Sequence, residues 1–135
     1  MNRHPEPTPR RLDVLLVEDS ENDALLIADA LRRAGYVPSW KRVDSAADLR
    51  AALGEAPWQA ILSDLRLPGF SGLDDFAICR ESGAEVPFVL VSGALDDGLT
   101  AAALEAGIRG CVSKDHLERL AGTLAELGIG RSKAD

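Results

Sequence analysis

The run Ala60–Ser63 (AILS) is apolar at almost every residue and leads directly into Asp64, which is followed by the turn-rich segment LRLPGFSG. Runs that lack an alternation of apolar and polar residues are typical of strands in parallel sheets whose two faces are both covered by helices. Ligands of such sheets bind at the carboxyl ends of the strands. Asp64 is therefore predicted to lie at a binding edge.

The rest of the chain repeats this alternation of strand and helix. Further strands are predicted at Leu12–Val17, Trp40–Val43, Val86–Val91 and Arg109–Ser113. Helical spacing and capping residues predict five helices, from Ser20 to about Ala34, from Ser45 to Leu53, from about Leu73 to Arg80, over Thr100–Ala106, and from Asp115 to about Leu127. Parallel strands joined by helical crossovers predict an α/β fold, a doubly wound five-stranded parallel sheet in the flavodoxin-like order 2-1-3-4-5.

Length and composition predict one globular domain. The chain has 135 residues, of which 46% are hydrophobic and 27% charged, as in ordinary soluble domains. We expect a flexible tail at residues 1–11, the folded domain at 12–127, and a second tail at 128–135. The net charge of −7 argues against nucleic acid as a partner and favours cations and basic protein surfaces.

The chain also lacks the sequence signs of membrane insertion and secretion. No apolar run approaches the ~20 residues that a membrane span needs, and the N-terminal residues include no apolar core of a signal peptide. Cys79 and Cys111 do not have the paired spacing of a zinc site or a redox motif. These observations predict a cytoplasmic protein with reduced thiols and no contact with a membrane.

Polar side chains follow four of the five predicted strands. Glu18 and Asp19 follow the first, Asp64 the third, Ser92 the fourth and Lys114 the fifth. In the order 2-1-3-4-5 these residues share one crevice. Clustered carboxylates repel one another unless a cation lies between them, and Mg²⁺ prefers such oxygen ligands. The sequence therefore predicts a Mg²⁺ site where a phosphate could approach Asp64, with Lys114 and Ser92 as hydrogen-bond donors.

Each of these residues also has an ordinary structural interpretation. Taken singly, an acid after a strand often caps the next helix or stabilises its positive end, and a lysine or serine at such a place is often solvated. The joint placement at successive strand ends favours a site. The remaining acids near helix starts are predicted to be surface or capping residues, namely Asp44, Asp74, Asp75, Asp96, Asp97 and Asp115.

The segments VLLVEDS, SDLRLPGFSG, VLVSG and VSKD resemble the receiver domains of two-component response regulators over residues 12 to about 127. The resemblance implies that Asp64 accepts a phosphoryl group from a histidine kinase. It further implies that Asp19 and Asp64 bind Mg²⁺ directly, that the Arg66 backbone carbonyl assists, and that Glu18 acts through water. Ser92 and Lys114 would contact the phosphoryl group.

Two positions depart from the usual receiver pattern. Cys111 occupies the position three before the lysine where many receivers carry an aromatic switch residue, and Asp115 replaces the proline that usually follows the lysine. A cis peptide bond without proline costs about 3 kcal/mol. We therefore expect a trans peptide between Lys114 and Asp115 and a shifted start of the last helix.

The resemblance implies a single-domain response regulator that signals through protein contacts. Its partners would be a sensor histidine kinase or a phosphotransfer protein and an unidentified downstream protein, with a homodimer as a possible state. It would not be an enzyme, apart from slow autodephosphorylation. One alternative is a receiver-like interaction module that works without phosphorylation. A phosphatase with an aspartyl nucleophile is disfavoured, because such enzymes need a second acid two residues later and position 66 is arginine.

Overall fold

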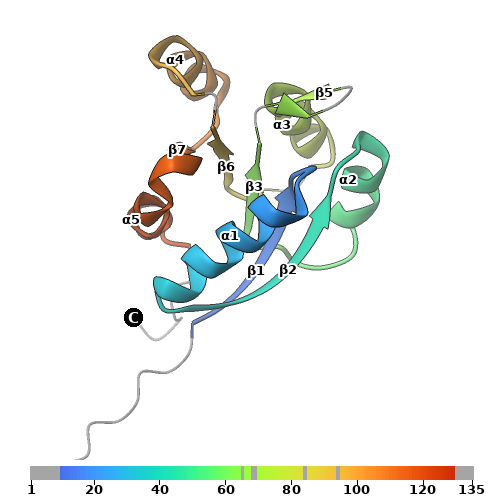
Figure 1. Cartoon of the computed structure of the whole chain (residues 1–135). Helices are drawn as coiled ribbons and strands as arrows, with labels where there is room; N and C mark the ends of the chain where they lie inside the picture. Colours follow the sequence, from blue (N-terminus) through green and yellow to red (C-terminus); the bar gives the residue numbers. More distant parts are fainter. Residues whose placement is uncertain (1–9, 65, 68–69, 84, 94, 130–135) are drawn as a thin grey trace, which may run out of the picture.

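The protein is built on a five-stranded parallel sheet (Figure 1). The computed structural model describes residues 10–64, 66–67, 70–83, 85–93 and 95–129. The sheet consists of β1 (Arg10–Val17), β2 (Tyr36–Val43), β3 (Ala60–Ser63), β6 (Phe88–Ser92) and β7 (Gly110–Ser113). Its order, β2-β1-β3-β6-β7, is 2-1-3-4-5 when its strands are numbered along the chain. The predicted flavodoxin-like sheet is confirmed.

Helices cover both faces of the sheet. They are α1 (Glu21–Arg33), α2 (Ala46–Leu53), α3 (Gly72–Glu81), α4 (Asp97–Ala106), the 3₁₀ helix η1 (Lys114–Arg119) and α5 (Leu120–Glu126). One apolar core packs α1 and α5 against the sheet, and a second packs α2, α3 and α4 against the opposite face. Successive residues of β1 divide between them, with Leu16 in the first core and Leu15 and Val17 in the second. This explains why the central strands β3 and β6 and the second half of β1 are apolar at almost every position.

The edges of the domain extend beyond the predicted boundaries. β1 begins at Arg10, two residues before the predicted strand, because the Arg10 guanidinium donates to the carbonyl oxygen of Ala34 at 2.8 Å and lies 4.5 Å from the centre of the Tyr36 ring. At the other end, Ile129 is buried, and its carbonyl oxygen accepts from the Tyr36 hydroxyl at 3.3 Å. Arg10 and Arg11, which were predicted as tail, therefore extend β1, and Ile129 packs into the core.

Other boundaries also differ. β2 begins at Tyr36 rather than Trp40, β6 spans Phe88–Ser92 rather than Val86–Val91, and β7 begins at Gly110 rather than Arg109. α4 begins three residues before the predicted Thr100, because the Asp96 carboxylate accepts from the Leu99 backbone N–H at 2.7 Å and caps the helix earlier. The segment after Asp64, predicted as a loop, contains a short antiparallel pair, β4 (Arg66–Leu67) with β5 (Phe70–Ser71).

The last helix is divided into two parts. The Ser113 hydroxyl accepts from the Asp115 backbone N–H at 3.1 Å at the start of η1. The non-helical backbone of His116 (φ −136°, ψ 50°) forms a kink inside η1, and α5 follows η1 directly. The predicted single helix from Asp115 is therefore wrong in its first turn, and the expected shift of its start relative to other receivers stays a prediction. No cis peptide bond occurs in the described ranges, so Lys114 and Asp115 are joined in trans.

Both cysteines are free thiols, as predicted. Cys79 is buried and Cys111 is half-buried.

Within the described part of the chain, no helix has the length and apolar character needed to cross a lipid bilayer.

Replacing Gly107 with alanine is expected to lower the free energy of unfolding by about 1–2 kcal/mol. Gly107 ends α4 with φ 106°, and an added Cβ would lie 3.3 Å from Cζ of Phe76. Urea unfolding would measure the loss. Gly122→Ala is the matched control, since an added Cβ there has no neighbour within 4 Å and alanine favours a helix by up to about 1 kcal/mol. Equal stabilities of the two variants would contradict the expectation.

Candidate phosphoacceptor and metal site

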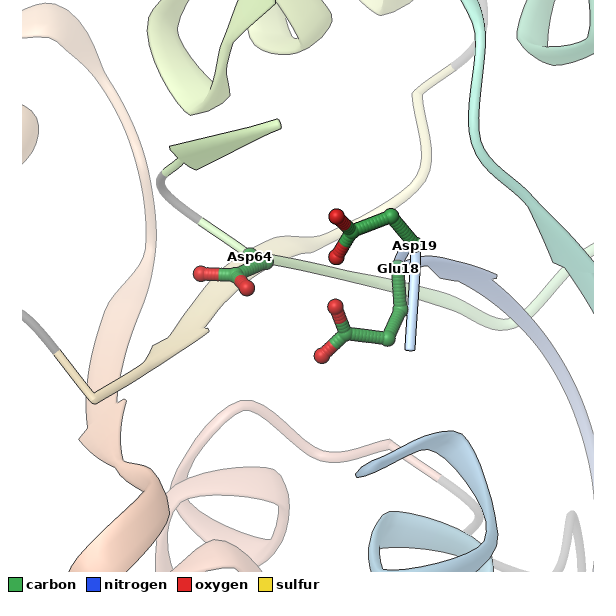
Figure 2. Close-up of side chains that lie close together, drawn as sticks. All are labelled: Glu18, Asp19 and Asp64. Atoms are coloured by element: carbon green, nitrogen blue, oxygen red, sulfur yellow. The ribbon is translucent and has the colours of Figure 1, made fainter. Parts of the chain in front are cut away.

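The ends of β1 and β3 bring three carboxylates together. Val17 pairs with Ser63 in the parallel register, and the Asp64 backbone N–H continues the ladder by donating to the Val17 carbonyl oxygen at 2.9 Å. The residues after these strands therefore lie side by side (Figure 2). Glu18, Asp19 and Asp64 each offer a carboxylate oxygen, and these oxygens lie within 4.8 Å of one another. The three acids that follow these two strands therefore lie together, as their positions in the sequence predicted.

Lys114 reaches this cluster from the end of β7 at the far side of the sheet. Its Nζ donates to Asp64 Oδ2 at 2.9 Å and to Asp23 Oδ2 at 2.7 Å, and it also forms a hydrogen-bonded ion pair with Glu18. Ser92 ends β6 and pairs with Ser113 in the register, directly before Lys114. Ser92 is buried at the same edge of the sheet. The five predicted side chains therefore come from strands that end together.

Burial and charge act against each other in the cluster. Burial raises the pKa of Glu18 to about 7, and the Asp64 carboxylate adds to this effect, while Lys114 lowers it in part. Burial alone would lower the pKa of Lys114. The hydrogen bonds to Asp23, Glu18 and Asp64 outweigh that effect and raise the Lys114 pKa above its ordinary value. The lysine is therefore held in its charged form and partly neutralises the acids around it.

Two residues of this site were not predicted to belong to it. The Asp23 backbone N–H donates to the Ser20 hydroxyl at 3.1 Å at the start of α1, and the Asp23 carboxylate forms an ion pair with Lys114. Arg42, at the end of β2, donates to the Glu18 carbonyl oxygen at 3.1 Å. Their positions in the sequence were the one indication of this role, since both residues lie at the ends of elements that meet at the carboxyl edge of the sheet.

Asp75 differs most from its prediction. It was assigned to the surface or capping acids, yet its side chain is fully buried against β3. Asp75 Oδ2 lies 2.6 Å from Ser63 Oγ, and the same Oγ lies 3.1 Å from the carbonyl oxygen of Asp64. Burial, the largest cause, raises the pKa of Asp75 to about 7. The buried Asp75 carboxyl therefore contacts Ser63, the residue directly before the predicted phosphoacceptor Asp64.

Arg66 and Cys111 were also singled out in the sequence. Arg66 lies in β4, two residues after Asp64, and pairs with Ser71; its carbonyl as a metal ligand stays a prediction. Cys111 is half-buried at the edge strand β7 and packs against the core formed with α2, α3 and α4. The position of the usual aromatic switch is therefore occupied by a small side chain within the packed structure.

Comparison with known proteins identifies the family. A model described as the response regulator receiver domain matches residues 14–125. The chain belongs to the response regulator receiver family. It is 31% identical over 116 residues to the transcriptional regulatory protein BaeR of Escherichia coli O6:H1, covering 84% of this chain and 45% of that protein. It is 28% identical over 125 residues to the sensory/regulatory protein RpfC of Xanthomonas campestris pv. campestris, covering 89% of this chain and 17% of that protein.

Solved structures show the same receiver fold. The chemotaxis response regulator CheY4 of Vibrio cholerae superposes with a TM-score of 0.71 at 21% identity, covering 87% of this chain and 98% of that one. A LuxR-family DNA-binding response regulator from Staphylococcus aureus gives 0.72 at 18% identity, covering 86% and 98%. The receiver spans less than half the length of the two curated relatives. Receiver domains are signalling modules of two-component systems, in which phosphorylation and Mg²⁺ are general features.

Proposed function

We propose that this receiver accepts a phosphoryl group on Asp64 from the phosphohistidine of a sensor kinase or phosphotransfer protein, with Mg²⁺ present, and signals in the cytoplasm through protein contacts of the single-domain type. The observation that carries this proposal is the contact of Lys114 Nζ with Asp64 Oδ2 at 2.9 Å inside a cluster of acids. The Asp64 side chain is 12% exposed. Its carboxylate is therefore positioned by a cation and still open on one side.

The residues present fit Mg²⁺. The cluster offers carboxylate oxygens alone, which are the ligands of a hard cation, and they lie within 4.8 Å of one another. Asp19 and Asp64 would hold the ion directly, Glu18 through water, and the Arg66 carbonyl would complete the protein ligands. When bound, the ion would offset the negative charge of the acids and of an incoming phosphoryl group.

The transfer itself needs few groups from the protein. A carboxylate oxygen of Asp64 attacks phosphorus, the bond between phosphorus and the donor's imidazole nitrogen breaks, and the nitrogen keeps the electron pair and takes up a proton. Lys114 Nζ would turn from the carboxylates to the phosphoryl oxygens, and the Ser92 hydroxyl would donate to another of them. Slow attack of water on the aspartyl phosphate would reset the domain.

A groove beside the acids suits a phosphodonor protein. It has a volume of about 490 Å³, lies between α1 and the η1–α5 segment, and is lined by residues that include Leu26, Arg33, Leu117 and Lys114 itself. Leu26 of α1, which lines the groove, is more than half exposed. Because Lys114 lines the groove and also contacts Asp64, a partner bound there would be next to the phosphoacceptor.

Incubation with acetyl phosphate and Mg²⁺ is expected to add one phosphoryl group, detectable by intact mass and mapped to Asp64 in a peptide digest. Chelation of Mg²⁺ should prevent the addition. Asp64→Asn should remove it, whereas the control Asp29→Asn should not, because Asp29 lies in α1 in an exposed pair with Arg33. An adduct that survives Asp64→Asn, or none in the wild type, would contradict the proposal.

The second candidate function is signalling by binding alone. Cys111 favours it, since a small side chain cannot transmit the rotation of an aromatic ring. Beryllofluoride with Mg²⁺ mimics the aspartyl phosphate, so unchanged backbone NMR shifts in α4 would favour this second function. The arginine at position 66 leaves the phosphatase alternative without its second acid.

A further inference from the structure

The buried Ser63 hydroxyl lies within hydrogen-bond distance of two oxygens but has only one hydrogen to donate. Ser63 Oγ lies 2.6 Å from Asp75 Oδ2 and 3.1 Å from the Asp64 carbonyl oxygen. A serine hydroxyl has one hydrogen to donate and can accept as well. A single hydrogen shared between the two acceptors would give two weakened bonds. Both contacts are full hydrogen bonds at once when Asp75 carries a proton and donates it to Ser63 Oγ.

The surroundings of Asp75 favour this protonated form. Its second oxygen, Oδ1, is buried and has no hydrogen-bond partner in the described part of the chain. An ionised oxygen without a partner in an apolar core is far more costly than the neutral carbonyl oxygen of a carboxylic acid. The 2.6 Å distance to Ser63 fits either form of Asp75, because a hydrogen bond from a hydroxyl to an ionised carboxylate is equally short.

The charges that face Asp75 act in the same direction. They are the carboxylates of Asp64, directly after β3, and of Asp74 on α3, both of which raise the pKa of Asp75. The Cys79 thiol, one turn further along α3, also faces Asp75 and is neutral, because burial and the Asp75 carboxylate raise its pKa to about 12. The positive end of α3 would favour the ionised form, but such a dipole contributes about 1 kcal/mol or less. With a pKa of about 7, both forms of Asp75 are populated near neutral pH.

We propose that Ser63 is a positioning residue for the phosphoacceptor and that Asp75 controls it. Protonated Asp75 donates to Ser63, so that Ser63 donates to the Asp64 carbonyl oxygen. Ionised Asp75, after its proton has passed to solvent, accepts the Ser63 hydrogen and leaves that carbonyl without this donor. The role rests on the proposed function of Asp64, because it concerns the same site.

The Asp64 carbonyl group belongs to the backbone that connects the phosphoacceptor to Arg66 in β4. A donor on that carbonyl restrains the peptide group between the Asp64 side chain and the Arg66 carbonyl assigned to Mg²⁺. Phosphorylation is therefore expected to be faster while Ser63 donates to Asp64 than after its hydrogen has turned to Asp75.

The first test is the rate of phosphorylation by acetyl phosphate at saturating Mg²⁺ from about pH 6 to about pH 9. As the pH rises through the titration of Asp75, the wild-type rate divided by the Asp75→Asn rate is expected to fall about fivefold, the effect of one hydrogen bond. The side-chain amide introduced by Asp75→Asn would donate to Ser63 at every pH. Ser63→Ala should lower the rate about fivefold at low pH and lose this dependence. A wild-type profile parallel to that of Asp75→Asn would overturn the proposal.

The second test needs no phosphoryl group. In ¹³C NMR of the wild type, the Asp75 carboxyl and the Asp64 carbonyl carbon are expected to titrate with one shared midpoint, and the Asp64 response should disappear in Ser63→Ala. If the ¹³C chemical shift of the Asp64 carbonyl does not change as Asp75 titrates, the proposal is overturned, even if Asp64 is phosphorylated. A shared titration without any adduct on Asp64 would retain the hydrogen-bond chain and contradict only the proposed function.

Discussion

Lys114→Met is expected to destabilise the metal-free protein by about 3 kcal/mol at alkaline pH, because removal of one partner from a buried ion pair leaves uncompensated charge. Lys114 contacts three carboxylates, and the side chains of Glu18 and Asp64 are only 2% and 12% exposed. Methionine keeps the length and apolar stem of lysine but not its charge. Urea unfolding in the presence of a chelator would measure the loss.

The effect of Lys114→Met is expected to depend on pH in a definite direction. Burial already raises the folded-state pKa of Glu18 above its ordinary value of 4.5, to about 7, and loss of the ammonium would raise it further. A carboxyl with a raised folded-state pKa destabilises the protein increasingly as pH rises above its unfolded value. The destabilisation should therefore shrink as the pH falls through the folded-state pKa of Glu18.

The same substitution is expected to tighten Mg²⁺ binding about tenfold, because the ion and the lysine attract the same carboxylate oxygens. Added Mg²⁺ should restore part of the lost stability. Lys41→Met is the control, since the exposed pair of Lys41 with Glu55 is worth less than about 1 kcal/mol. Equal losses in the two variants, or unchanged Mg²⁺ affinity, would contradict the expected role of Lys114.

Asp75→Asn is expected to increase the free energy of unfolding at alkaline pH by as much as about 4 kcal/mol. The folded state raises the pKa of Asp75 from 3.8 to about 7, so the native protein keeps its proton where the unfolded chain has lost it. Wild-type stability therefore falls as pH rises between these values and stays lower above them. Asparagine has no such ionisation.

The difference between wild type and Asp75→Asn should be small at about pH 4 and largest above about pH 7. Asp74→Asn is the matched control, because Asp74 lies in the same turn of α3 and is exposed. Its effect should stay within about 0.5 kcal/mol at every pH. A constant difference between wild type and Asp75→Asn across this range would show that burial does not hold Asp75 in its neutral form.

The sequence was sufficient for the sheet and for the acids at its edge. Residues that follow parallel strands must meet at one edge, so the positions of Glu18, Asp64 and Lys114 after apolar runs predicted that they would lie together. The same argument did not predict that Asp23 and Arg42 belong to the site, because their contacts depend on how α1 and β2 are oriented against β1. The division of the last helix likewise depends on the packing around Ser113.

By itself, the sequence determined the order of elements, the two apolar faces of the sheet and the acids after β1 and β3, because each follows from local pattern and the geometry of parallel strands. Only the tertiary structure decided which acid at the start of α3 is buried. Asp74 and Asp75 are chemically identical neighbours, and the rotation of α3 against β3 turns Asp75 toward Ser63 and Asp74 toward solvent. That rotation is set by contacts across the whole core.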